Sequence, residues 1–249
     1  MAVNDLGGGL RGGVAFLSRL PVDSGEADWE QFRTLPVAFP LVGYLIGALV
    51  ALPFFLPAPS ATVAFAYLLA LAVVVGIPHF DGVADLGDAV AAHGPSSRRA
   101  ALKDTDTGVG AIVAVAVVFL GLVLAALALS TAPLAVAVAV VIAAEVGAKL
   151  GMATVGCLGT AGHEGMGSQF TTVLDSGMLV VPALAAVPAA VAVLPATLAA
   201  VLAGPLVAVV LVDWADEQLG GVSGDIFGAT NELARVAGLH LGVVAWTLW

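Results

Sequence analysis

Thiols and charged side chains are both scarce in this 249-residue chain, and each scarcity excludes a class of protein. The single cysteine, Cys157, excludes an internal disulfide and any metal site built from several cysteines. Only 10% of the residues are charged, whereas a soluble domain has about a quarter. Lysine and arginine together number 8 against 18 acids, so the chain lacks the basic footprint that nucleic-acid binding requires.

Apolar residues are abundant instead: they make up 60% of the chain and give a mean hydropathy of +1.07. Apolar runs of about 18 or more residues recur, which is enough to span a bilayer. The sequence therefore predicts an all-α, polytopic integral membrane helical bundle of about six to seven transmembrane helices, with short cytoplasmic helices for the acidic motifs. Residues 1–249 are expected to form one membrane-embedded domain, with a polar cytoplasmic segment at 1–35.

The hydropathy pattern predicts seven spans and a sidedness. The spans are 36–57, 61–78, 109–129, 134–155, 178–194, 196–212 and 234–249. The fifth and sixth form either a hairpin that turns near Pro195 or a re-entrant segment.

Seven spans leave four polar segments on one side of the membrane: 1–35, 79–108, 156–177 and 213–233. The turns near Ala58, Thr131 and Pro195 on the other side contain no charge. The crowded side is predicted to be cytoplasmic because it receives these cations: Arg11, Arg19, Arg33, Arg98, Arg99 and Lys103.

One charged pair, Glu145 and Lys149, falls inside a predicted span, near its cytoplasmic end. The i, i+4 spacing lets the two side chains pair on one helical face. Such a pair either tolerates burial by neutralising its own charge or faces a substrate.

An acidic motif, HFDGVADLGDA (79–89), follows the second predicted span. On a helix, Asp81, Asp85 and Asp88 share one face, where like charges repel unless a cation relieves them. Carboxylates without thiols suit Mg²⁺ or Mn²⁺, with substrate phosphates completing the coordination. The alternative is a solvated acidic face. His79 lies on the far side of the helix and is expected to be hydrogen-bonded rather than a ligand.

Two further polar segments supply groups for metal and phosphate. In GGVSGDIFGATNELARV (220–236), Asp225 and Glu232 share one helical face, and Ser223-Gly224 can open that helix. In LKDTDTGVGAIV (102–113), Lys103 and Asp104 precede a helix start, and a helix N-terminus beside a lysine can receive phosphate. With two neighbouring arginines, these groups indicate phosphoryl transfer at a membrane surface.

Six segments, in their order along the chain, resemble the cobalamin synthase (adenosylcobinamide-GDP ribazoletransferase) family. They are FLSRLPV (16–22), FPLVGYLIGA (39–48), the acidic motif, LKDTDTGVGA (102–111), HEGMGSQF (163–170) and GGVSGDIFGATNEL (220–233). The resemblance extends over about residues 16–234, and the joint order of the motifs is specific where each motif alone is not.

The resemblance implies a multipass membrane enzyme that joins adenosylcobinamide-GDP to α-ribazole, or to its 5′-phosphate, and releases GMP with Mg²⁺ (or Mn²⁺). The single domain would then be catalytic. Its implied partners are the lipid bilayer and the two substrates. A second copy of the chain and other corrinoid-pathway proteins are further candidates, and nucleic acid is not.

The resemblance also implies roles for individual residues. The matched catalytic residues are Asp81, Asp85, Asp88, Lys103, Asp104 and Asp225. The three acids of the acidic motif and Asp225 are the expected metal ligands, although Asp225 could instead orient the nucleophile. The expected substrate contacts are Arg19, Arg98, Arg99, Glu164 and Glu232. Arg19 could instead anchor the chain at the interface, and Glu164 could be a solvated loop acid.

One residue departs from the family pattern. Asp106 stands where many relatives have an arginine, which leaves Arg98 or Arg99 as the replacement cation.

Three alternative functions fit the sequence less well. A CDP-alcohol phosphatidyltransferase has the pattern D-x2-D-G-x2-A-R, whereas here glycine directly follows Asp81 and no arginine follows Ala84. A small-solute transporter conflicts with the charge-free opposite side. A scaffold for soluble partners leaves the clustered acids unexplained.

Overall fold

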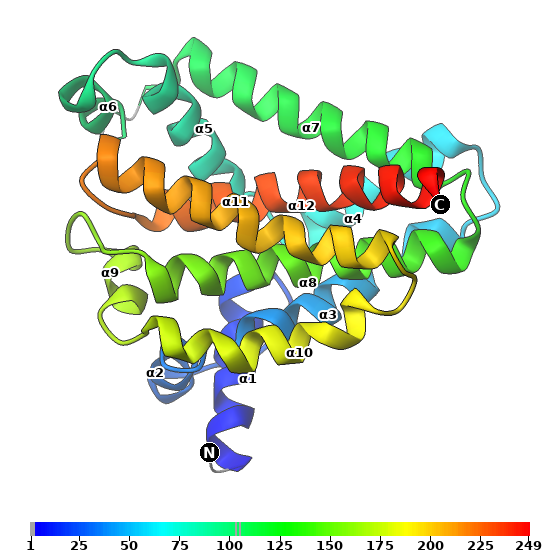
Figure 1. Ribbon diagram of the computed structural model, residues 1–249, viewed down its shortest axis with the longest axis horizontal. Helices are drawn as coiled ribbons and strands as arrows, with labels where there is room; N and C mark the ends of the chain where they lie inside the picture. The colour runs from blue at the N-terminus through cyan, green and yellow to red at the C-terminus, as the bar shows by residue number, and fades with distance from the viewer. Residues whose placement is uncertain (1–2, 103, 105) are drawn as a thin grey trace.

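Within the described residues, 3–102, 104 and 106–249, the computed structural model of the chain contains helices and no strand (Figure 1). The elements are α1 (Val3–Leu17), α2 (Glu26–Arg33), α3 (Ala38–Val50), η1 (Leu52–Phe55), α4 (Ser60–Val74), α5 (Pro78–Ala91), α6 (Pro95–Ala101), α7 (Val109–Leu129), α8 (Leu134–Leu158), α9 (Met166–Thr171), η2 (Ser176–Leu179), α10 (Val180–Ala190), α11 (Ala196–Gln218) and α12 (Gly224–Leu248). The predicted all-α fold is confirmed.

Several helices are long and apolar enough to cross a membrane. Among the described residues there are 4 such stretches: Ala38–Phe55, Val109–Leu129, Leu134–Leu158 and Ala196–Gln218. A fifth span exists if the bent pair of α4 and α5 crosses the membrane as one unit. A helical membrane protein is therefore confirmed, but the predicted count of six to seven spans is not. The difference lies partly in α10, whose 11 residues are too short for a full span.

The outermost long helix, α7, has the surface that lipid contact requires. It is apolar on all sides, yet Val109, Ile112, Val117 and Leu120 are exposed. A large exposed apolar surface marks a protein–protein or a membrane interaction site, and the length and apolar composition of α7 favour lipid contact. By contrast, α8 is buried along most of its length and forms the centre of the bundle with α11 and α12 (Figure 1).

Small residues let the central helices approach closely. A Cβ atom added at Gly147 of α8 would lie 2.7 Å from the Val201 carbonyl oxygen of α11, and Gly204 of α11 faces Gly147 in turn. Membrane helices pack by such close contacts because lipid provides no hydrophobic force between them. The central helices can therefore bring polar groups together from distant parts of the sequence.

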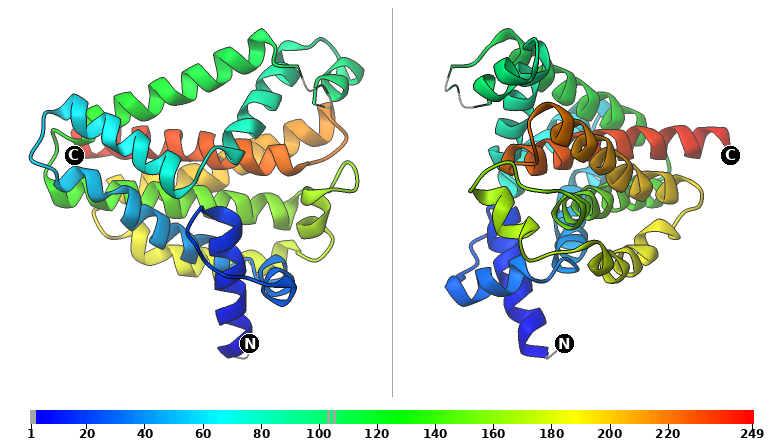
Figure 2. Two further views of the ribbon diagram at one scale, coloured as in Figure 1. Left: turned by 180° about the vertical axis from the view of Figure 1, so that it is seen from behind. Right: turned by 60° about the vertical axis from the view of Figure 1, so that its left-hand side comes forward.

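A sharp break separates α4 from α5 and directs the acidic motif. The two helices are bent by 100°. The chain turns at Gly76, whose φ of +80° favours glycine, and α5 begins with Pro78 at its first position. From the break, α5 runs towards the end of the bundle where α6 lies, as the left view of Figure 2 shows.

The polar connections gather at one end of the bundle. Figure 1 shows α6, α9 and the loop between α11 and α12 at that end, with the turns after α7 and α10 and the C-terminus at the other. This matches the predicted grouping for the connections around α6, α9 and the α11–α12 loop, whereas α1 of the predicted segment 1–35 projects from the side of the bundle (Figure 1). In the N-terminal segment, α2 joins the polar end through Trp29, whose Nε1 donates to Gln169 Oε1 of α9 at 3.0 Å.

One predicted polar segment, 213–233, is wrong in the placement of its second half. Residues 224–233 are helical, as predicted, but they are the first part of the long helix α12, and Glu232 is fully buried within the bundle. The predicted position of Glu145 and Lys149 near a helix end is also wrong, since both lie in the middle of α8. The predicted pairing of these two side chains is confirmed, with Lys149 Nζ 3.1 Å from Glu145 Oε2.

Candidate active site

The acidic motif and the late Gly-Asp segment meet where α5 crosses the start of α12. A Cβ atom at Gly82 would lie 2.5 Å from the Asp225 carbonyl oxygen and 3.0 Å from its Cα, so only glycine fits at this crossing. Asp85 follows one turn later on α5. Its carboxylate is partly buried and experiences the negative charges of Asp225, Asp81 and Asp88. The crossing therefore concentrates like charge from two distant segments.

Asp225 is held at the opening of α12. Ser223 is the residue before the helix, as the sequence predicts, and its Oγ donates to Asp225 Oδ2 at 3.0 Å. A carboxylate in the first helical turn is favoured by the positive end of the helix dipole. Its orientation is therefore set by local contacts.

A small polar pocket opens beside Asp225. Its volume is about 120 Å³, and its lining residues are Arg99, Leu102, Gly162, His163, Leu219, Gly221, Ser223 and Asp225. Backbone hydrogen bonds join two of the contributing loops: Val222 N donates to Thr160 O at 2.8 Å, and Gly162 N donates to Val222 O at 3.2 Å. The pocket combines a guanidinium, an imidazole and a carboxylate, a set that can hold a phosphate and a metal-bound oxygen.

Asp88 has a structural contact that the sequence analysis did not foresee. Its Oδ2 accepts from Gly108 N at 2.8 Å, and its Oδ1 accepts from Ala111 N at 2.9 Å. The carboxylate thus caps the N-terminus of α7. This is the helix start that was expected to receive phosphate, so a phosphate there would compete with Asp88.

The predicted arginines occupy different settings. Arg98 bonds to Gln218 Oε1, donates from Nε to Ala92 O at 3.2 Å, and lies 5.9 Å from the centre of the Trp214 ring. Arg99 lines the pocket. Arg19 lies at the break before α5, where its side chain packs over Gly76. Of the three, Arg99 is the one beside Asp225.

Three further predicted residues, Asp104, Glu164 and Glu232, are not among the residues that line this pocket. Asp104 is exposed, and its Oδ1 accepts from Asp106 N at 3.1 Å. Glu164 is an exposed loop residue next to His163. Glu232 is fully buried in an ion pair with Arg235. Lys103 lies outside the described residues. The roles of all four stay predictions.

The carboxylates suit a cation that a substrate helps to bind. Among the described residues, no group of three His, Cys, Asp or Glu side chains is arranged closely enough to hold a metal ion alone. Mg²⁺, however, is usually bound by one or two carboxylates together with substrate phosphates and water. Asp85 and Asp225 suit that mode because both offer carboxylate oxygens and the negative charge of Asp225 acts on Asp85. Metal binding stays a prediction.

Comparison with known proteins identifies the family. The model of a family described as cobalamin-5-phosphate synthase matches residues 9–243. The chain belongs to the cobalamin-5-phosphate synthase family. A relative from Halorubrum lacusprofundi is 50% identical over 96% of this chain and 97% of its own length. Another from Haloquadratum walsbyi is 42% identical over 96% and 98%.

Both relatives are named adenosylcobinamide-GDP ribazoletransferase, as is one from Halobacterium salinarum that is 54% identical over 76% of this chain and 97% of its own. No solved structure gives a significant match. Membership in this family confirms the resemblance found in the motifs and disfavours the CDP-alcohol phosphatidyltransferase alternative.

Sequence reasoning missed two sets of polar residues. His163 was within a quoted motif, but its position beside Asp225 depends on the fold. Asn231 and Arg235 join the Glu145–Lys149 pair inside the bundle. The i, i+3 spacing of Glu232 and Arg235 was a visible signal of pairing, but the predicted span began at 234 and so placed Glu232 outside the membrane.

Proposed function

We propose that this protein joins adenosylcobinamide-GDP to α-ribazole, or to its 5′-phosphate, and releases GMP. Similarity over nearly the whole chain to relatives with the corresponding name supports the reaction. The structural observation behind the proposal is the crossing of α5 and α12 at Gly82, with Asp85 and Asp225 close to it. The pocket with Arg99 adjoins this crossing, so anionic and cationic groups flank one position for a diphosphate.

In the proposed reaction, a ribazole hydroxyl oxygen attacks the phosphorus attached to cobinamide. A new P–O bond forms there, the bond to the GMP phosphate breaks, and GMP leaves with the bonding electrons while the hydroxyl loses its proton. Arg99 would bind phosphate oxygens, and Asp225 would hold metal or orient the hydroxyl. Mg²⁺ or Mn²⁺ at Asp85 and Asp225 would neutralise charge on the diphosphate.

A reconstituted assay tests this function. Purified protein in liposomes should convert adenosylcobinamide-GDP and α-ribazole to the joined product and GMP when Mg²⁺ or Mn²⁺ is present. Excess chelator should abolish turnover, and added Mg²⁺ should restore it, because the diphosphate charge is then neutralised again. Full activity in chelator would exclude metal assistance, and product formation from a CDP-alcohol instead would favour the lipid-synthase alternative.

The proposed active side is cytoplasmic, and cysteine labelling tests this. Starting from a Cys157→Ala variant, single cysteines at positions 85, 104, 164 and 225 should react with an impermeant maleimide only after cells are permeabilised. These positions belong to α5, the loop after α6, the loop before α9 and the start of α12, which lie towards the polar end of the bundle (Figure 1), and arginines at that end favour the cytoplasm. Thr131→Cys, in an exposed turn at the other end, is the matched control and should react in intact cells. A split among the four positions would contradict the proposal.

A further inference from the structure

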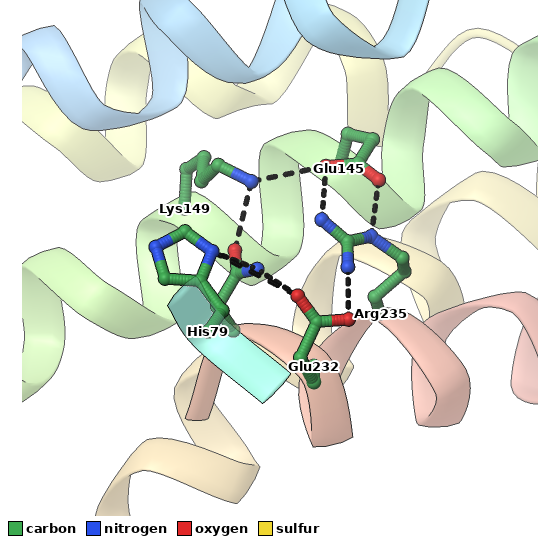
Figure 3. Close-up of polar contacts among 6 residues, drawn as sticks. His79, Glu145, Lys149, Glu232 and Arg235 are labelled. Carbon is green, nitrogen blue, oxygen red and sulfur yellow. Dashed lines mark hydrogen bonds and ion pairs between the residues drawn. The ribbon is translucent and has the colours of Figure 1, made fainter. Parts of the chain in front are cut away.

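Farther from the polar end than the candidate site, in the middle of the bundle, six polar side chains form one connected network (Figure 3). Its members are His79 of α5, Glu145 and Lys149 of α8, and Asn231, Glu232 and Arg235 of α12. Five of them are at most 1% exposed, and the His79 side chain is 12% exposed. The two carboxylates balance the two cations, which makes burial tolerable.

The chemistry of the partners fixes how Asn231 is oriented. Lys149 Nζ, which can only donate, lies 2.8 Å from Asn231 Oδ1. The amide nitrogen of Asn231 must then face the other way, where it donates to Glu232 Oε1 at 2.8 Å and lies 3.0 Å from His79 Nδ1. Because two donors facing each other would repel, His79 Nδ1 is the acceptor and the ring proton is on Nε2. The network thus ends at His79 as a neutral acceptor.

This contact connects the two helices that form the candidate site. His79 is in the first turn of α5, two residues before Asp81, and Asn231 is on α12 below Asp225. A Cβ atom at Gly228 would lie 3.2 Å from the His79 carbonyl oxygen, so the two backbones also touch here. Since α5 follows a 100° break, its direction is not set by continuity with α4 and depends on such tertiary contacts.

We propose that His79 and Asn231 are positioning residues. Their hydrogen bond, anchored by the buried ions of α8 and α12, fixes the direction of α5 and thereby the distance of Asp85 from Asp225. The inference rests on the proposed function, and it adds that the mid-bundle network sets the geometry of the site at its end. If the network only stabilised the fold, turnover and the mobility of α5 would not depend on whether a replacement acceptor takes the position of Nδ1 or that of Nε2.

A matched pair of variants tests the position of the acceptor. In His79→Asn, the amide oxygen can take the position of Nδ1, whereas in His79→Gln the amide lies nearer that of Nε2. His79→Asn should keep turnover near the wild-type value. His79→Gln should lower turnover about 10–100-fold, the usual loss when the support of a site is removed. It should also raise the Mn²⁺ concentration needed for binding, followed by electron paramagnetic resonance.

A second readout follows α5 without using activity or metal. In the Cys157→Ala background, a nitroxide on Val90→Cys, an exposed site in the last turn of α5, reports the mobility of that helix. The label should gain mobility in His79→Gln and not in His79→Asn. If the wild type forms no product, the proposed function fails, while the label still tests the positioning.

The outcomes are separable. Equal behaviour of the two variants would overturn the proposal, as would lost turnover in His79→Gln with an unchanged label spectrum. If His79→Gln does not insert, His79→Ala, which removes the acceptor without adding volume, takes its place in both measurements. Failure of both to insert while His79→Asn inserts would also overturn it, because the contact would then serve folding alone.

Discussion

Replacing Asp85 with asparagine is expected to lower turnover by at least about 100-fold while membrane insertion is unaffected. Loss of a group that merely supports a metal ligand already costs about 10–100-fold, so loss of a ligand should cost no less. Asparagine keeps the size of the side chain but removes the negative charge that Asp85 contributes beside Asp225. Turnover should be measured by GMP release in liposomes. Insertion is checked by recovery of the variant from the membrane fraction, and its folding by thermal unfolding of the purified protein.

Asp23→Asn is the matched control for this change. Asp23 is an exposed acid outside the predicted set, and the same loss of one charge there should leave turnover unchanged. If Asp85→Asn retains wild-type rates, Asp85 does not take part in the reaction. A similar loss in both variants would instead attribute the effect to the overall charge of the chain.

The sequence predicted the helices best where hydropathy alone decides the structure. The span predicted at 109–129 coincides with α7, because an uninterrupted apolar run ends in polar or small residues on both sides. The acidic motif was correctly predicted as helical, and Ser223 was correctly predicted to precede α12. These features depend on local sequence, which is visible without a fold.

Prediction failed where distant residues compensate each other. Glu232 and Arg235 interrupt the hydropathy of α12, so the span was predicted to begin only at 234, although Arg235 is paired inside the bundle with both Glu232 and Glu145 of α8. Likewise, Asp88 resembles its neighbours Asp81 and Asp85 in the sequence. Only the fold shows that it caps α7. Such pairings depend on which helices touch, and periodicity does not specify that.

The residues whose burial the sequence did not predict and the candidate site depend on the same contacts among α5, α8 and α12. The acids at the end of the bundle repel one another, whereas the buried ions in its middle attract. Because α5 and α12 belong to both groups, attraction in the middle can offset repulsion at the end. We therefore expect the second large effect from a change in the buried group.

Arg235→Met should reduce the free energy of unfolding by about 3–5 kcal/mol, because it leaves two buried carboxylates without their shared cation. Unfolding by SDS titration of the purified protein measures this. Arg33→Met is the matched control, since Arg33 and Glu30 have the same i, i+3 spacing but their side chains are 24% and 50% exposed. A surface pair of that kind contributes about 0–1 kcal/mol.

A double variant separates charge from packing in this buried group. Glu145→Gln combined with Arg235→Met restores the balance, leaving Lys149 and Glu232 as opposite charges joined through Asn231. The double variant should therefore be more stable than Arg235→Met alone, although it has one more substitution. The single Glu145→Gln variant is measured as well. If its loss of stability and that of Arg235→Met simply add in the double variant, the lost packing of the arginine explains the effect and charge balance does not. If Arg235→Met costs no more than Arg33→Met, the buried ion pairs do not stabilise the bundle.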